Sequence, residues 1–132
     1  MPDPAARLTT LRNGLLRLHK CLLEAERAAY ERDIERITSS GQYLNLVLSD
    51  PWFAWLRDLS QFIVMVDEAL AADEPVTGAE ASRLVALARE LVSPDETGNG
   101  FRRRYFEVMQ RDPGVVLAHR DMNRVFAELI HT

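Results

Sequence analysis

The sequence predicts an all-α protein: an antiparallel helical bundle of four main helices plus two short helices, formed as one domain by residues 1–132. Three observations lead to this fold class. Apolar residues recur at three- and four-residue spacing through several long segments. No segment keeps the alternation of a half-buried strand, and no Asn-Gly turn joins two apolar runs. The connections between periodic segments are short, so consecutive helices are expected to be neighbours.

The first predicted helix extends from about Pro4 to Thr38. A stripe of large apolar residues runs along it with helical spacing. The sequence Ser-Ser-Gly at 39–41 is expected to end this helix, and a short helix is predicted at residues 42–49. The stripe consists of Leu8, Leu11, Leu15, Leu18, Leu22, Tyr30, Ile34 and Ile37.

The second long helix is predicted from Asp50 to about Ala72. Asp50 is a suitable N-cap residue, and Pro51 suits the first helical position. At 100° per residue, Asp67 falls inside the apolar arc, whereas Glu68 faces away from it. We expect both tryptophans to pack within the core, since the arc is centred on Trp52, Leu56, Leu59, Ile63, Val66 and Leu70, with Trp55 at its side.

Three more helices are predicted in the remaining chain. Thr77 and Glu80 form a capping-box pattern, which is typical of a helix start. The pair Asp112-Pro113 repeats the start chemistry of Asp50-Pro51. The first of these helices begins after Thr77 and ends near Val92, and the second covers residues 101–111. The third begins at Asp112-Pro113 and ends near Ile130.

Ionisable residues fall on the buried faces of three predicted helices. Four of them are spaced by seven residues along the first helix, and a straight helix drifts only about 20° per heptad. We call these four the polar ladder. The ladder consists of Arg12, His19, Glu26 and Asp33. Outside the ladder, Asp67 on the second long helix and His119 on the last helix also fall on buried faces.

Two interpretations of these residues remain open. In the structural one, which we favour, they form separate buried pairs: His19 or His119 with Asp67, or Arg12 with an acid on another helix. In the functional one, they form a polar site in the bundle interior that holds a metal ion or a small ligand, as in an enzyme built on a bundle. The members of that site would be His19, Glu26, Asp67 and His119.

The spacing of the ladder argues against a metal. Residues seven apart on a helix are separated by about 10.5 Å along its axis, so His19 and Glu26 could not share one ion. The Glu-x-x-His spacing of di-iron bundles occurs once, at Glu128 and His131 near the chain end. Cys21 has no positioned base and is expected to be inert. We therefore expect no cofactor and name no catalytic residue, and an enzyme is the less favoured class.

The segment "GNGFRRRYF" is a second candidate site. Its arginines follow a loop and a predicted helix start, and arginine binds phosphate and carboxylate groups well. Arg102, Arg103 and Arg104 are thus candidates for binding an anion or an acidic partner. A solvated charged face is the alternative, and it is the more common role of such a run.

Composition and charge restrict the partners and the compartment. The net charge of −4 argues against nucleic acid. Residues 51–100 contain three basic and nine acidic residues, whereas residues 101–132 contain six basic and four acidic ones, so two copies could attract each other. A single cysteine, no signal-peptide pattern and no membrane-spanning apolar stretch favour a cytoplasmic protein.

Three blocks of the sequence resemble a family of small, uncharacterised all-helical bacterial proteins. The blocks are "LLRLHKCLLEAERAAYER", "LVLSDPWFAWLRDLSQFIVMVDEAL" and "RRYFEVMQRDPGVVLAHRD". The resemblance implies a stand-alone helical protein and no particular activity. Together with the charge pattern, it leads to the expectation of a helical-bundle module that acts by binding a protein partner or by self-association, with dimerisation as one form.

Overall fold

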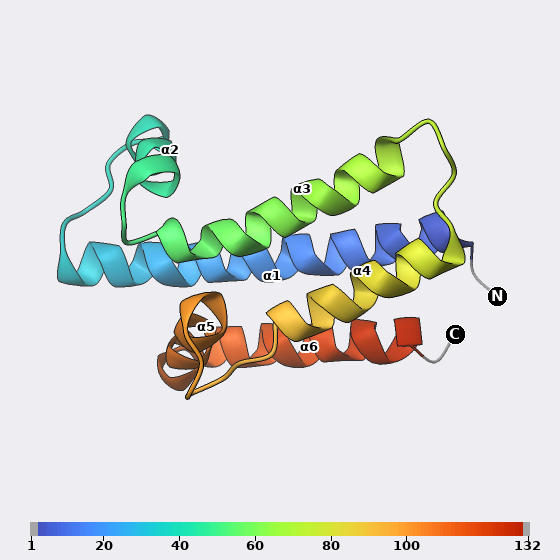
Figure 1. The fold of residues 1–132 in the computed structure, drawn as a ribbon. Coiled ribbons are helices and arrows are strands. Elements are labelled where there is room, and N and C mark those ends of the chain that lie inside the picture. Colours follow the sequence, from blue (N-terminus) through green and yellow to red (C-terminus); the bar gives the residue numbers. More distant parts are fainter. Residues whose placement is uncertain (1–2, 131–132) are drawn as a thin grey trace.

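The computed structural model describes residues 3–130 and is all-helical, as predicted, with no strand in that range (Figure 1). The described residues form six α-helices and one short 3-10 helix, η1. No helix in the described range is both long and apolar enough to cross a lipid bilayer. The elements are α1 Pro4–Asp33, α2 Ser40–Ser49, η1 Ala54–Leu56, α3 Arg57–Ala71, α4 Gly78–Leu91, α5 Gly100–Arg111 and α6 Pro113–Ile130.

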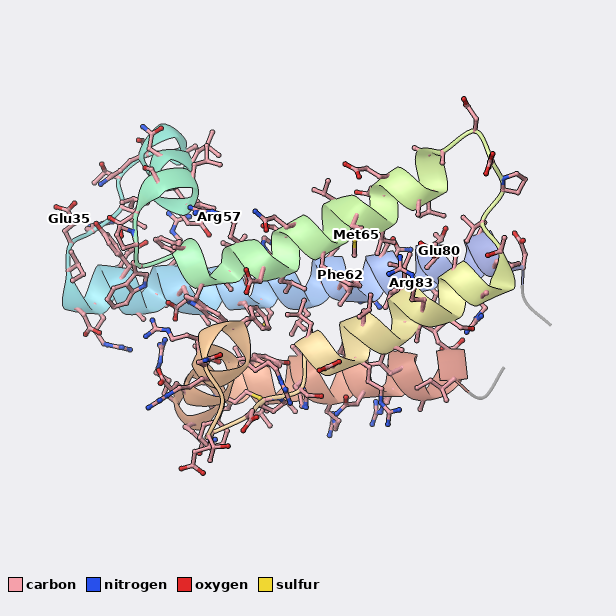
Figure 2. All side chains as sticks on the ribbon, viewed as in Figure 1. Glu35, Arg57, Phe62, Met65, Glu80 and Arg83 are labelled. Atoms are coloured by element: carbon pink, nitrogen blue, oxygen red, sulfur yellow. The ribbon has the colours of Figure 1, made fainter. Side chains whose placement is uncertain are left out.

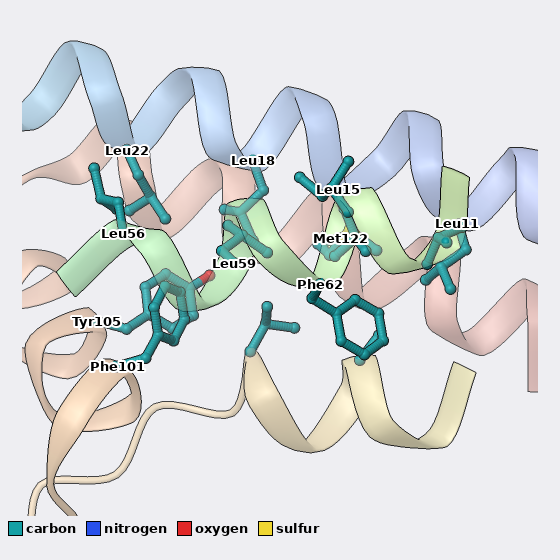
Figure 3. Packing of buried hydrophobic residues seen from close by; sticks show 14 of the residues in the cluster. Leu11, Leu15, Leu18, Leu22, Leu56, Leu59, Phe62, Phe101, Tyr105 and Met122 are labelled. Carbon is teal, nitrogen blue, oxygen red and sulfur yellow. The ribbon is translucent and has the colours of Figure 1, made fainter. Parts of the chain in front are cut away.

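Helix α1 is the element against which the other long helices pack. It contacts α3, α4 and α6, and the long helices that follow it along the chain alternate in direction (Figure 1). Both ends of the described chain lie at the same end of the molecule. The leucine stripe of α1 faces apolar residues from α3 and α6 (Figure 3). Its five leucines are all buried: Leu8, Leu11, Leu15, Leu18 and Leu22.

The C-terminal end of α1 differs from the prediction. The helix ends at Asp33 rather than near Thr38, and Ile34 is 59% exposed instead of continuing the buried stripe. The segment that follows contains the β-branched residues Ile34, Ile37 and Thr38, which favour helix less than straight-chain residues do. Leaving the helix lets the chain turn towards α2 while Ile37 still packs against the core.

The start of the second long helix also differs from the prediction. Asp50 is the C-terminal cap residue of α2, and its carboxylate accepts a hydrogen bond from the backbone N–H of Trp52 at 2.8 Å. The carbonyls of Asp50 and Pro51 then accept the N–H groups of Phe53 and Ala54, three residues on, at 3.1 and 3.2 Å. The chain therefore passes through a turn and η1 before α3 begins at Arg57, and Phe53 becomes buried in the core.

The short helix α2 begins at Ser40, with Ser39 as its N-cap, so Ser-Ser-Gly at 39–41 starts this helix rather than ending α1. The predicted starts of α4 and α6 agree with the structure. At the second Asp-Pro pair, Oδ1 of Asp112 accepts the backbone N–H of Gly114 at 2.9 Å, and α6 begins at Pro113. The hydroxyl of Thr77 accepts the N–H of Glu80 at 3.1 Å at the start of α4. The Glu80 carboxylate pairs with Arg83 rather than completing the capping box.

Candidate functional site

The first residue of the polar ladder pairs with the acid on α3. Nε of Arg12 forms an ion pair with Oδ1 of Asp67. The contact does not have the geometry of a hydrogen bond. The two side chains are 38% and 45% exposed, so the pair is half-hydrated. Asp67 is thus partly buried and Glu68 is exposed, as the helical projection indicated. This is the kind of pairing between helices that the structural interpretation expected for Arg12.

Glu26 is the buried centre of the polar ladder, with a relative exposure of 0%. Its carboxylate accepts a hydrogen bond from the indole N–H of Trp55 at 3.3 Å and forms a close ion pair with Arg111 of α5. Its backbone carbonyl accepts the indole N–H of Trp52 at 3.2 Å. The two tryptophans therefore bind Glu26 in addition to packing. We call Glu26, Trp52, Trp55 and Arg111 the Glu26 cluster.

The physical role of the Glu26 cluster follows from its burial. An isolated buried carboxylate is costly, and an ion pair with further hydrogen bonds offsets that cost. The cluster joins α1, the turn before α3, and the end of α5, which are far apart in sequence. Arg111 remains 38% exposed, so water reaches the cation but not the carboxylate. The arrangement holds three segments together without presenting a reactive group.

The last ladder residue, Asp33, lies at the end of α1 and is exposed. It forms an ion pair with the adjacent Arg32 at 3.0 Å. The hydrogen bond from Arg32 lowers the pKa of Asp33, and the charges of Arg32 and Arg111 act in the same direction, while partial desolvation opposes them. Asp33 is thus a surface carboxylate with a local partner.

His19 lines a small cleft between α1, α2 and the start of α3. The cleft has a volume of about 200 Å³ and includes Leu23, Leu48 and Phe53 among its walls. Burial lowers the pKa of His19, so the imidazole is neutral near pH 7. No hydrogen-bond partner for the ring occurs within residues 3–130. His19 therefore does not pair with Asp67, which is occupied by Arg12.

His119 forms a separate polar group at the α5–α6 contact. Its Nδ1 lies 2.8 Å from the hydroxyl of Tyr105, and its Nε2 lies 3.2 Å from the side-chain amide of Asn123. Which ring nitrogen donates depends on the tautomer of the imidazole. Burial lowers the pKa of His119 and raises that of Tyr105, with the nearby Cys21 as a lesser cause for Tyr105. Both groups are neutral near pH 7.

The four interior candidates therefore have different neighbours. Glu26 binds Arg111, Asp67 binds Arg12, His119 binds Tyr105, and His19 faces an apolar cleft. Across the described part of the chain, no three His, Cys, Asp or Glu side chains are grouped so that they could hold a metal ion. The Glu128–His131 spacing lies partly outside the described residues.

The arginine triplet on α5 is divided between two environments. Nε of Arg102 donates to the carbonyl of Ser93 at 2.9 Å and thereby fixes the loop before α5. Arg103 and Arg104 are exposed, and both form ion pairs with the carboxylate of Glu107. The N–O distances are 3.4 Å for Arg103 and 3.6 Å for Arg104. Two of the three positive charges are thus partly compensated by an acid on the same helix.

Cys21 is a protonated thiol. Its Sγ lies 3.7 Å from the carbonyl of Gly114, to which it donates. Burial raises its pKa, and the negative charge of Asp112 is the next largest cause. A thiol in this environment has little thiolate and is a poor nucleophile.

Two surface cavities along α4 and α6 were not predicted from the sequence. The first has a volume of about 520 Å³ and the second about 470 Å³. Because they share Arg89, Ser93 and Ile130, we treat them together as the α4–α6 trough. The sequence hardly indicated this trough. Ser82 and Arg89 are seven residues apart and so share one face of α4, but such a spacing is ordinary on an exposed helix face. The remaining walls are Arg7, Ser82, Val85, Ala86, Glu90, Pro94, His119, Asn123, Phe126 and Ala127.

An apolar groove lies between α3 and α4. It has a volume of about 370 Å³ and is lined by Asp58, Gln61, Phe62, Met65, Leu87 and Leu91. Figure 2 shows Phe62 and Met65 on α3, with Glu80 and Arg83 on the side of α4 that faces them. Both helices pack mainly against α1 rather than against each other, which leaves this furrow between them. We call it the α3–α4 groove.

Comparison with known proteins gives no relative. No protein-family model, no curated protein and no solved structure matches the chain.

Proposed function

We propose that this protein is a cytoplasmic helical-bundle module that binds another protein through the α3–α4 groove. In this proposal the four long helices form an antiparallel bundle. The observation that carries the proposal is the groove itself: Met65 and Leu87 are 38% and 39% exposed along a concave, mostly apolar surface.

The shape and chemistry of the groove suit an amphipathic helix. Phe62 and Met65 are three residues apart on α3, and Leu87 and Leu91 are four apart on α4, so each wall presents a continuous helical stripe. A partner helix placed between two such walls buries its own apolar stripe. Methionine is flexible and polarisable, which lets Met65 adapt to the side chain that it contacts.

The charges around the groove favour a basic partner. Asp58 lies in the lining, and Glu68 follows Gln61 by one heptad on the same face of α3. On α4, the carboxylate of Glu80 is compensated by Arg83. The excess charge along the groove is therefore negative. We infer that the partner helix carries lysine or arginine beside its apolar stripe, since charge complementarity guides association and selects partners.

A second copy of the chain is the other occupant that the charge pattern allows. The basic excess in residues 101–132 would meet the acidic excess in residues 51–100 of the copy. The groove would then be an interface between unlike surfaces of the two copies. The metal-binding or enzymatic alternative has no comparable supporting observation among the described residues.

The proposal is tested by three versions of the protein. Leu87→Glu places a charge inside the groove, whereas Val64→Glu places one beside it, on a residue that is 53% exposed and outside the lining. Protein captured from a lysate of the source cells should bind wild type and Val64→Glu but not Leu87→Glu. The captured partner, once purified, should show the same order by calorimetry.

The size of the protein in solution separates the two occupants. A concentration-dependent dimer that Leu87→Glu abolishes and Val64→Glu keeps would assign the groove to a second copy. A monomer that binds no partner, or binding that is equal in all three proteins, would contradict the proposed function.

A further inference from the structure

We infer that the α4–α6 trough binds a small amphipathic monoanion, such as an aliphatic carboxylate. This inference is independent of the α3–α4 groove, which lies on another face of α4. The two cavities that form the trough have volumes of about 520 and 470 Å³, within the range of small-molecule sites. Such sites are mainly apolar with a few convergent polar groups.

The charged residues of the trough leave one positive charge in excess. Arg7 and Arg89 contribute two guanidinium groups and Glu90 contributes one carboxylate. Neither arginine forms an ion pair with an acid anywhere in residues 3–130. His119, at the other end, is neutral because burial lowers its pKa. A single negative charge on a ligand would balance this set.

Arg7 is held in place before any ligand arrives. Its guanidinium donates to the hydroxyl of Ser82 at 3.2 Å and to the carbonyl of Leu129 at 3.3 Å. Its Nε is buried without a hydrogen-bond acceptor among the described residues. A preorganised cation between α1, α4 and α6 lowers the cost of ordering on binding.

The polar and apolar walls would determine how the ligand is oriented in the trough. Arg89 lines both cavities, and a guanidinium can bind a carboxylate in a bidentate manner. The apolar walls come from both helices and accept a hydrocarbon chain, which excludes a bare inorganic anion as the best ligand. These walls are Val85 and Ala86 on α4, and Phe126, Ala127 and Ile130 on α6.

The test uses octanoate as the probe and backbone amide NMR as the readout. Octanoate should cause saturable shifts at trough residues such as Ser82, Ala86 and Ala127, and none at Val64. Octan-1-ol should bind at least about fivefold more weakly, and octyltrimethylammonium more weakly still, since charge-assisted hydrogen bonds are about twice as strong as neutral ones. Equal affinities for the three probes, or no saturable shift with octanoate, would overturn the inference.

Variants locate the site and separate it from the groove. Arg89→Gln should weaken octanoate binding about tenfold, as expected for the loss of a charge-assisted contact. Arg83→Gln, on the same helix outside the trough, should leave the affinity unchanged. Ala86→Trp fills the trough from an exposed position and should abolish binding, whereas Ala79→Trp should not.

The groove variant Leu87→Glu tests whether octanoate binding is independent of the α3–α4 groove. Leu87→Glu should bind octanoate as wild type does, so failure of the proposed function would leave this inference standing. Wild-type affinity in Arg89→Gln or in Ala86→Trp would contradict the trough as the site. Thermal melting should show that every variant is folded before it is titrated.

Discussion

Two ion pairs on the same face of α1 show how burial changes the role of a charge. Arg12 and Glu26 belong to the same heptad-spaced ladder, and each meets an opposite charge from another helix. The Arg12–Asp67 pair is half-exposed, so water competes for both charges and its contribution is small. In the Glu26–Arg111 pair the carboxylate is fully buried. Loss of the arginine would leave that charge without water or a counterion.

The comparison also shows which partner matters more within the buried pair. Arg111 looks like a surface residue because its side chain is 38% exposed, and it can be hydrated if Glu26 is removed. Glu26 has no such alternative. We therefore expect an asymmetric pair, in which removing the exposed member costs more than neutralising the buried one.

The largest predicted effect is that of Arg111→Ala. It leaves the Glu26 carboxylate buried with only the Trp55 indole as a donor, and it should lower the free energy of unfolding by about 3 kcal/mol. Chemical denaturation measures this change. The matched control is Arg104→Ala, an exposed arginine on the same helix, which should change stability by less than about 0.5 kcal/mol. Equal effects in the two variants would show that the Glu26 cluster is not a stabilising contact.

The second prediction concerns Trp55→Phe. This change keeps an aromatic ring beside Phe101, whose centroid lies 5.2 Å from that of Trp55, but removes the indole N–H that donates to Glu26. We expect a loss of about 1.5 kcal/mol, the usual cost of deleting a hydrogen bond to a charged group. Most of this loss should disappear in a Glu26→Gln background, where the acceptor is neutral. A loss that is the same in both backgrounds would assign the effect to packing instead.

The third prediction is a pH dependence caused by the two partly buried histidines. Burial lowers the pKa of both His19 and His119 in the folded protein, so the unfolded chain binds more protons just below pH 6.5. The two histidines therefore leave the stability unchanged above that pH and lower it as the pH falls below it. Urea unfolding at pH 7.5 and 5.5 should show lower stability at pH 5.5.

The histidine variants sharpen this third prediction. His19→Gln and His119→Gln should each reduce the difference in stability between pH 7.5 and 5.5. The carboxylates whose pKa is lowered, Asp33, Glu80 and Asp95, lose their stabilising effect at a more acidic pH, because their ordinary values are near 4. An unchanged difference in both histidine variants would assign the pH dependence to other groups.

The smallest predicted effect distinguishes the neighbours Asp67 and Glu68. Asp67→Ala removes the partner of Arg12 and should cost about 0.5–1 kcal/mol, since the pair is half-exposed. Glu68→Ala removes an exposed carboxylate and should be neutral within about 0.5 kcal/mol. Differential scanning calorimetry compares the two melting temperatures. Identical melting temperatures would mean that the Arg12–Asp67 contact contributes nothing to stability.

The sequence predicted those features of the fold that depend on local periodicity. The α1 leucine stripe, the orientation of Asp67 relative to Glu68, and the start of α6 follow from helical spacing or from capping chemistry. The same Asp-Pro pair failed as a helix start at Asp50, although both aspartates accept the N–H two residues on, because at Asp50 the chain continues as a turn that buries Phe53. The same local signal thus has two outcomes, and tertiary packing selects between them.

The partners of the interior charges could not be predicted, for a related reason. Glu26 meets Trp55 and Arg111, which are 29 and 85 residues away, and no sequence pattern links these positions. The ladder indicated that Glu26 would be buried but not what would bind it. The trough and the groove were likewise unpredictable, because each is formed where two helices fail to fill the space between them.

A pair of double-mutant cycles tests the central claim most directly. One cycle combines Glu26→Gln with Arg111→Gln, and the other combines Arg12→Gln with Asp67→Asn, with the coupling free energy measured by urea unfolding. Burial predicts a coupling of at least about 1.5 kcal/mol for the first pair and less than about 1 kcal/mol for the second. A coupling for Arg12 and Asp67 that equals or exceeds that for Glu26 and Arg111 would contradict the account.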